Sequence, residues 1–382
     1  MTEKESALYS HYIIDGVRMD MTPAELLDEC MEYEESDFLP AEGFDDIIDE
    51  STEPPLSSFS YDSSNEKEFL RQTAEAANDE RQFMMLYPEY FTRLQIAKAL
   101  LARLWSEGHF RLGNLRLWAQ WEWNTRPLGN MAAFYSSAES ASEYIYGLGV
   151  KLEDYLFIEG DGTSNAKFFA WLEDFEHDDT DPETLFKASP YESRHPWIEE
   201  SRRCPSTISD DTSSWIIYIP FDTCSFKMGG SLLSQVTGNN GGKAPAIADP
   251  DYFIDCYEVV RELVEDGIVL SGVTVADGGL ATAAYRMCGE NGMDIDLKGI
   301  MSSYQESDRT RILFGEVPGV LIQISDENYD YVDSQFILQD IAYYPVGHPS
   351  GKHRRLNISE TSRNGVSDIL FSLLSHTSEG ED

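Results

Sequence analysis

Apolar residues recur at helical spacing in three stretches of the chain. Within residues 90–105 and 129–146 they follow the i, i+3, i+4 pattern that turns one stripe of a helix toward a core. The third stretch begins at Asp249-Pro250, where an acidic cap precedes a proline at the first helical position, and it ends at Gly267. The spacing predicts a core helix over each of these ranges.

Strict alternation and short apolar runs predict strands. Residues 115–123 alternate apolar with polar side chains, as a strand with one buried face does, and this favours their tryptophans as core residues over a ligand platform. Apolar runs predict further strands at residues 215–219, 268–275, 311–314 and 320–324, and helical spacing predicts a helix at residues 280–287. Alternating strands and helices indicate an α/β (α+β) fold with two domains joined after about residue 220.

The chain turns sharply at Asp277-Gly278-Gly279, between an apolar strand and a helix. Such a turn points backbone N–H groups and a helix N-terminus at one spot, which suits a phosphate or another small anion. A strand, a tight turn and a helix are also ordinary scaffolding. Taken alone, this motif leaves both interpretations open.

The first 66 residues differ in composition from the rest. They are rich in Asp and Glu, and Lys4 and Arg18 are their only Lys or Arg residues. Thr22-Pro23 predicts the start of a short helix, whereas residues 47–66 are polar and rich in Ser and Pro, which predicts a linker. We interpret residues 1–66 as an acidic extension that serves either as a solubilising arm or as a docking segment for a basic partner.

A second polar stretch, residues 173–214, predicts a long excursion within the first domain. Its run Glu176-His177-Asp178-Asp179-Thr180-Asp181 resembles a set of metal ligands. No glycine there provides the sharp turn around which the ligands of a hard metal are spaced. A solvated acidic loop is therefore the favoured interpretation.

Composition narrows the range of partners. The chain has 382 residues, 41% of them hydrophobic, and a formal net charge of -41, which argues against nucleic acid or an anionic membrane as a partner. The first ten residues lack the pattern of a signal peptide, and the chain contains no apolar run long enough to span a bilayer, so we expect a cytoplasmic protein. The five cysteines lack C-x-x-C spacing, and we expect them to be reduced and mostly buried.

Three ordered blocks resemble a known family. They are residues 226–235 with Gly229-Gly230-Ser231, residues 275–280 with the Asp277 turn, and residues 313–323 with Glu316. In this order and spacing they resemble the second synthase half of large phosphoribosylformylglycinamidine synthase, in the aminoimidazole ribonucleotide synthetase-like superfamily. Residues 115–121 and 133–149 are similar to that half's N-terminal domain, and residues 344–347 to a strand and turn near its end. The resemblance covers about residues 90–375.

The resemblance implies a PurM-like N-terminal half-barrel domain at residues 67–220, a PurM-like C-terminal α/β sandwich domain at residues 221–375, and a polar tail at residues 376–382. Family members use ATP to convert an amide oxygen into an amidine in purine synthesis, with ammonia from a glutaminase. No glutaminase portion is expected in this chain, so a separate glutaminase subunit is implied. ATP or ADP is the implied ligand. The resemblance of the three blocks and of the matching helix places it at Gly229, Gly230, Ser231, Asp277, Gly278, Gly279, Glu316 and Lys98.

This chain departs from the family at its ligand positions. Thr274 and Ala276 stand where the family's H-D-x-S-D-G-G motif has a metal-binding Asp and a nucleotide-binding Ser. Lys98 and Ala102 stand at the ends of its E-A-L-x-N motif, which supplies further metal ligands. Magnesium and catalytic residues are therefore not assigned. We hypothesise that Lys98 occupies the place of the lost metal and faces what remains of the anion site, which predicts nucleotide or phosphate binding without metal.

The family's glycine-rich loop is represented here by residues 160–166. The lysine of that loop is absent unless Lys167 replaces it. The glycines and the carboxylates that persist in the chain also serve turn geometry and capping, so structural retention is favoured over ligand binding.

Three functions remain open. The leading hypothesis is a divergent, non-catalytic half that acts as a structural or regulatory subunit. Because two halves of the family pair their N-terminal domains into a shared barrel, it implies a homodimer or a partner chain that carries the other half. The second is an active ATP-dependent carbon–nitrogen ligase that takes ammonia from a separate glutaminase. The third is a binding protein that uses this fold for an unrelated partner.

Overall fold

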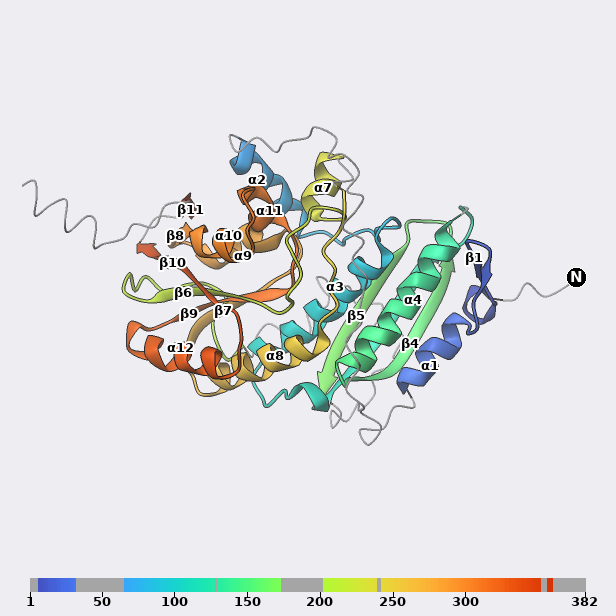
Figure 1. Ribbon diagram of the computed structural model, residues 1–382, viewed down its shortest axis with the longest axis horizontal. Helices are drawn as coiled ribbons and strands as arrows, with labels where there is room; N and C mark the ends of the chain where they lie inside the picture. The colour runs from blue at the N-terminus through green and yellow to red at the C-terminus, as the bar shows by residue number, and fades with distance from the viewer. Residues whose placement is uncertain are drawn as a thin grey trace, which may run out of the picture.

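The computed structural model describes residues 6–31, 65–127, 129–172, 202–238, 242–351 and 356–359. Of the three sheets in these residues, the two larger lie beside one another, a three-stranded sheet on the right of Figure 1 and a six-stranded sheet on the left, and β1 and β2 form the third. The linker predicted within residues 47–66 and the acidic run at residues 176–181 lie outside the described residues, apart from the end of the linker at residues 65–66.

The three-stranded sheet has the order β4-β3-β5, with β3 parallel to β4 and antiparallel to β5. Helices α1, α3 and α4 pack against it, and α4 crosses in front of the strands in Figure 1. The elements of this part are η1 (Ala7–Tyr9), β1 (Ile13–Ile14), β2 (Val17–Arg18), α1 (Pro23–Met31), α3 (Pro88–Leu101), η4 (Ala102–Trp105), η5 (Leu112–Asn114), β3 (Leu115–Asn124), α4 (Asn130–Gly147), β4 (Lys151–Gly160) and β5 (Asn165–Leu172).

The six-stranded sheet has the order β11-β8-β10-β6-β9-β7, antiparallel except where β11 runs parallel to β8. Helices α9, α10 and α11 lie above it in Figure 1, and α8 and α12 lie below. Its elements are β6 (Trp215–Pro220), α7 (Leu232–Thr237), α8 (Pro250–Glu265), β7 (Val269–Val275), α9 (Gly279–Cys288), β8 (Gly292–Asp296), α10 (Lys298–Ser303), α11 (Arg309–Phe314), β9 (Gly319–Ile324), η6 (Asp326–Asn328), α12 (Tyr329–Leu338), β10 (Tyr344–Gly351) and β11 (Leu356–Ser359).

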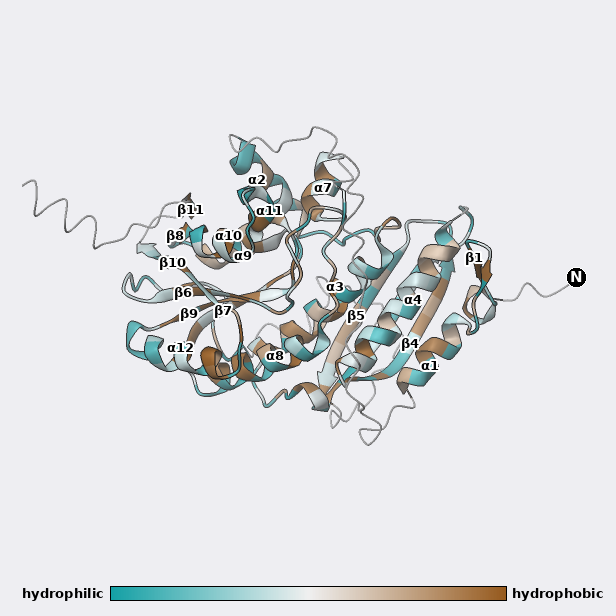
Figure 2. Ribbon diagram, viewed as in Figure 1, coloured by the Kyte–Doolittle hydropathy of each residue, from teal (hydrophilic) through white to brown (hydrophobic). Residues whose placement is uncertain are grey.

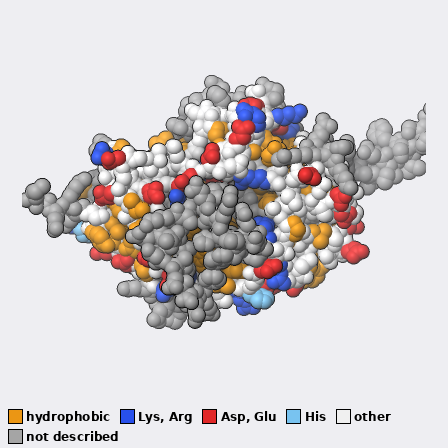
Figure 3. Space-filling model, turned by 180° about the vertical axis from the view of Figure 1, so that it is seen from behind, with side chains coloured by type: hydrophobic (Ala, Val, Ile, Leu, Met, Phe, Trp, Pro, Cys, Tyr) orange, Lys and Arg blue, Asp and Glu red, His pale blue; other side chains and the backbone are white. Residues whose placement is uncertain are grey.

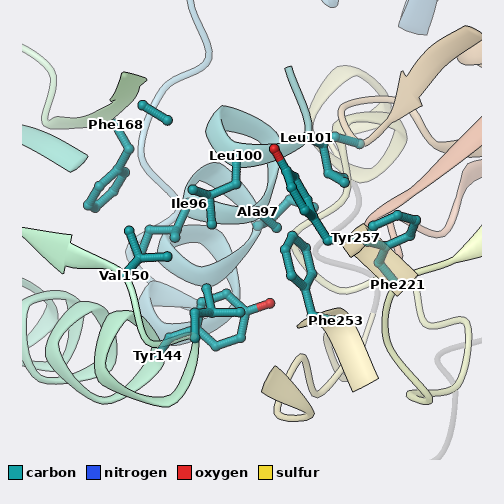
Figure 4. Close-up of a cluster of buried hydrophobic side chains, with 14 of the residues drawn as sticks. Ile96, Ala97, Leu100, Leu101, Tyr144, Val150, Phe168, Phe221, Phe253 and Tyr257 are labelled. Atoms are coloured by element: carbon teal, nitrogen blue, oxygen red, sulfur yellow. The ribbon is translucent and has the colours of Figure 1, made fainter. Parts of the chain in front are cut away.

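Helix α3 joins the cores of the two parts. Its residues Ile96 and Leu100 are fully buried, and they belong to the same cluster as Phe168 of β5 and Phe253 of α8 (Figure 4). Because one helix is buried by side chains from both parts, moving the parts apart would expose apolar surface on each of them.

Helix α2 (Glu66–Ala76) lies between α1 and α3 in sequence, but it packs on helices of the six-stranded part. It contacts α7 and α9, and Phe69 enters the core under α11 by an edge-on contact with Phe314. Much of α2 is teal in Figure 2, and its exposed residues Lys67, Glu68, Arg71 and Glu75 are all charged. Residues 77–87 then lead from α2 to the start of α3.

Most elements predicted from apolar spacing are present. The three predicted helices correspond to α3 with η4, to α4 and to α8, and the predicted strands at residues 215–219, 268–275 and 320–324 correspond to β6, β7 and β9. The core placement of the tryptophans in β3 is also confirmed, since Trp121 and Trp123 are buried. The single buried face predicted for β3 is wrong, because Trp118 and Gln120 of the other face are buried as well.

The strand predicted at residues 311–314 is wrong, because these residues form the end of helix α11. Asp308 caps this helix, its side chain accepting a hydrogen bond from the Thr310 N–H at 2.9 Å. A short apolar run does not by itself distinguish a strand from a buried helix, and here the capping residue decides.

The helix predicted at Thr22-Pro23 is confirmed as α1. The Thr22 N–H donates to the Glu25 carboxylate at 2.7 Å, and the Glu25 N–H donates to the Thr22 hydroxyl at 3.3 Å, a reciprocal capping box. Leu27 and Cys30 of α1 are buried in the same core as α4. Part of the acidic extension therefore packs on the first sheet's helices.

The five cysteines are free thiols, and all except the partly buried Cys224 are buried, as expected. Within the described ranges, no helix is both long enough and apolar enough to cross a bilayer. On the face seen in Figure 3, acidic and basic side chains of the described residues are interspersed.

Candidate functional site

The Asp277-Gly278-Gly279 turn lies where β7 ends and α9 begins, facing helix α3. Gly278 and Gly279 both have left-handed backbone angles, with φ of 79° and 66°. These angles swing the chain from strand into helix and bury the Asp277 side chain, of which 8% is exposed. The sequence-predicted turn is therefore present, with its carboxylate directed into the protein.

Both carboxylate oxygens of Asp277 are held by cations. Arg81 Nη1 lies 2.6 Å from Oδ1, and Lys98 Nζ lies 2.5 Å from Oδ2. Burial by itself raises the pKa of Asp277, but the charges of Lys98 and Arg81 outweigh it and hold the pKa well below its usual range. Asp277 is thus a permanently ionised carboxylate at neutral pH.

Glu316 is fully buried beside this pair and accepts four polar contacts. Its Oε1 accepts hydrogen bonds from the Gly278 N–H at 2.7 Å and the Leu232 N–H at 2.9 Å. Its Oε2 accepts from the Tyr90 hydroxyl at 2.6 Å and lies 2.9 Å from Arg81 Nη2. Burial, followed by the charge of Glu316, raises the pKa of Tyr90 well above its usual value, so the phenol remains a donor. All four donors come from the protein itself.

The Gly229-Gly230-Ser231 block completes this cluster. The Gly230 carbonyl accepts a 2.5 Å hydrogen bond from Arg81 Nη2, and the Ser231 hydroxyl caps α7 by accepting from the Ser234 N–H at 3.2 Å. A Cβ at Gly229 would lie 2.3 Å from the Gly242 carbonyl oxygen. These residues serve close packing and capping within the chain.

The positions where the resemblance implies lost ligands are also engaged by the protein. The Thr274 hydroxyl accepts a 2.9 Å hydrogen bond from the indole N–H of Trp105, whose ring packs against Gly272. Ala276 is buried and accepts the Gly279 N–H through its carbonyl, and Ala102 follows the last residue of α3. Each position now contributes to contacts within the chain.

The glycine loop at residues 160–166 spans the end of β4 and the start of β5. It lies beside the segment that carries Arg81, since the Phe83 N–H donates to the Ser164 carbonyl. Lys167, the candidate replacement for the family's lysine, pairs with Glu80 at 2.6 Å.

A divalent metal does not fit this arrangement. Two cations already hold the oxygens of Asp277, and the described residues contain no group of three or more His, Cys, Asp or Glu side chains able to hold a metal. Protein atoms also lie close to the turn itself. A Cβ at Gly279 would lie 2.7 Å from the Leu313 carbonyl oxygen, so its free side faces protein backbone.

The residues predicted to share one site, Lys98, Asp277, Glu316 and both glycine turns, do lie together in the structure. Their assignment to nucleotide binding remains a prediction. Arg81, Tyr90 and Trp105 were missed. The sequence offers one signal for Arg81, which is the only basic residue between Gln72 and Thr92. That signal by itself indicates no chemistry.

The depressed pKa of Asp277 makes a prediction for acid stability. Its folded pKa lies below the unfolded value of about 3.9, so its contribution is complete above that pH and is lost as the pH falls toward the folded pKa. The gap in melting temperature between wild type and Asp277→Asn should be widest above about pH 5 and shrink below about pH 4. Calorimetric melting from pH 7 to pH 2.5 tests this. Asp161→Asn removes an exposed carboxylate and serves as the control; a gap for Asp277→Asn that does not change with pH would contradict the prediction.

Residues 223–348 match the family model described as "AIR synthase related protein, C-terminal domain". The chain is 24% identical over 274 residues to the probable phosphoribosylformylglycinamidine synthase, chloroplastic/mitochondrial, of Arabidopsis thaliana, covering 69% of this chain and 18% of that protein. It is 29% identical over 167 residues to phosphoribosylformylglycinamidine synthase subunit PurL of Methanocaldococcus jannaschii, covering 43% of this chain and 22% of that protein. The chain thus spans about a fifth of the length of these relatives.

Among solved structures, T. maritima PurL complexed with FGAR is similar with a TM-score of 0.50 and 12% sequence identity. The match covers 70% of this chain and 40% of that one. Likeness at this level of identity concerns the fold, and it confirms the predicted mixed α/β architecture.

Proposed function

We propose that this chain has a structural or regulatory role without catalysis. It is a PurM-like relative of the phosphoribosylformylglycinamidine synthases of purine biosynthesis. In this role the chain serves as one half of a synthase-like assembly. The chain spans only a fraction of the length of the longer relatives, and we do not propose that it has their activity, substrates or partners.

The proposal rests on one observation, that Lys98 and Arg81 both form ion pairs with the Asp277 carboxylate. ATP-driven amide activation needs a divalent metal and a polar cradle for the phosphates. Here an ammonium lies 2.5 Å from the carboxylate, and a second cation holds its other oxygen. This ion pair supports the proposal that Lys98 takes the place of the family's metal. Its charge is directed at Asp277, which weakens the case for an external anion as its partner.

The first sheet supports pairing with another half. Within the described ranges, β4 and β5 each pair with β3 alone, so the three-stranded sheet is open at both edges. Open edges favour association with further strands. We therefore propose either a homodimer or a partner chain with the other half, and a separate glutaminase would join only an active assembly.

Turnover and binding measurements test the lack of catalysis. With formylglycinamide ribonucleotide, ammonia and magnesium, the purified chain should release no phosphate from ATP above background. Calorimetry with ADP should show no binding heat with or without magnesium, and a complete phosphoribosylformylglycinamidine synthase run in parallel controls both assays. Ammonia-dependent turnover would support the active ligase instead. ADP binding that needs no magnesium would support nucleotide binding through Lys98.

A native mass measurement separates a homodimer from a monomer.

A further inference from the structure

We propose that Arg81, Lys98, Asp277 and Glu316 form a latch that holds the two parts of the chain in one orientation without any ligand. Glu316 acts in it as a resident anion, and Lys98 as a resident cation. The latch deepens the proposed function and rests on it, since both require that no nucleotide enters between α3 and the Asp277 turn.

The latch crosses from one part of the chain to the other. Lys98 and Tyr90 belong to α3, and Arg81 belongs to the segment that leads into it. Asp277 and Glu316 follow β7 and α11 of the six-stranded part. Every charge pair in the cluster therefore ties α3 or its leading segment to the second sheet and its turns.

The charges within the latch balance. Two carboxylates face one guanidinium and one ammonium, and the side chains of Arg81, Asp277 and Glu316 are at most 8% exposed. Buried charges are tolerated when they are paired and hydrogen-bonded, and removal of one partner leaves the other uncompensated. The four groups are therefore interdependent, and an external ion would have to break existing pairs in order to enter.

Glu316 fills the role predicted for an anion at the glycine turns. It collects two backbone N–H groups, from the turns before α9 and at α7, together with a phenol and a guanidinium. A small external anion would seek the same kinds of donors at such a site. The donors remain directed at one point because the chain supplies its own carboxylate there.

Trp105 adds a second tie beside Lys98. Its indole N–H donates to Thr274 of β7, and Gly272 has no side chain that would displace the ring, since a Cβ there would lie 2.2 Å from it. Arg202 spans the same edge by donating to the Gly272 carbonyl at 2.6 Å. The edge strand β7 is thus fastened to η4, directly after the helix that carries Lys98.

Chemical rescue tests the resident anion. Glu316→Ala should lower the melting temperature by roughly 5–8 °C, because four buried donors lose their acceptor. Formate, at about ten times its Kd, should restore about 2 °C in this variant and nothing in wild type beyond an equal concentration of chloride. Glu68→Ala removes an exposed carboxylate and is the matched control, which formate should not affect. A Glu316→Ala variant that melts like wild type, or that shows no specific response to formate, would overturn the latch.

A milder variant keeps the test decisive if Glu316→Ala does not fold. Lys98→Met removes the partly exposed cation, and backbone hydrogen exchange at residues 276–280 should accelerate by about tenfold. In wild type, exchange at these residues should stay unchanged when ADP and magnesium are added. Unchanged exchange in Lys98→Met, or nucleotide-dependent protection in wild type, would refute a ligand-independent latch. The formate rescue and the exchange in Lys98→Met use the isolated chain without nucleotide, so they fail separately from the turnover and ADP-binding assays.

Discussion

Replacement of Arg81 by methionine should lower the free energy of unfolding by about 3–5 kcal/mol. Methionine fills a similar volume but leaves Asp277 with Lys98 as its one ion-pair partner in the described structure. It also leaves Glu316 without its only ion pair among the described residues. The Gly230 carbonyl loses its donor as well. Because domains are stable by only about 5–15 kcal/mol, the loss should be visible as an early transition in denaturant.

Equilibrium unfolding in urea, followed by tryptophan fluorescence and circular dichroism, measures this change. Arg71→Met is the matched control, since Arg71 also makes two ion pairs, with Glu68 and Glu75, but on an exposed face of α2. Exposed pairs contribute little, so this variant should unfold almost as wild type does. Equal losses for the two variants would mean that burial of the Arg81 cluster adds nothing to stability.

Local patterns predicted most of the core elements. Helix α8 carries its own signals, with Asp249 as cap, Pro250 at its first position and Gly267 after its end. β3 was found from its alternation, but the burial of Trp118 and Gln120 on its second face depends on residues far away in the chain. Helix α11 was missed because a short apolar run has no clear period, and Asp308 was not recognised as its cap.

The candidate site was predictable only in part, for a similar reason. Asp277 and Glu316 lie in turns with recognisable glycines, and family resemblance reached them. Arg81 lies 196 residues from Asp277 in sequence, and Tyr90 lies 226 residues from Glu316. No periodicity or spacing joins residues at such separations, so tertiary structure was needed to show what these carboxylates bind.

The two glycines of the turn have protein atoms close to them, where a ligand would need open space. A glycine at an anion site leaves room for the ligand to approach the backbone. At Gly278, a Cβ would lie 2.4 Å from the Thr282 hydroxyl oxygen, and at Gly279 it would meet the backbone of α11. Gly278 leaves room for the Thr282 side chain of α9 itself, and Gly279 lets α9 pack closely on the end of α11.

Gly279→Ala should therefore destabilise the protein by about 3 kcal/mol, through two additive causes. An alanine with φ near 66° costs about 1–2 kcal/mol in backbone strain. Its Cβ would also lie 2.7 Å from the Leu313 carbonyl oxygen and 2.9 Å from the Phe314 Cα. Backbone atoms cannot rotate aside as a side chain does, so overpacking adds about 1–3 kcal/mol.

Gly267→Ala separates these two causes. Gly267 follows α8 with φ of 70°, nearly the same angle as at Gly279, but nothing lies within 4 Å of its missing Cβ. Its substitution should cost only the backbone strain, about 1–2 kcal/mol in urea unfolding. The excess for Gly279→Ala then measures how tightly α9 is packed against α11. If the two variants lost equal stability, the turn would have room at Gly279, and space for a ligand there would have to be considered again.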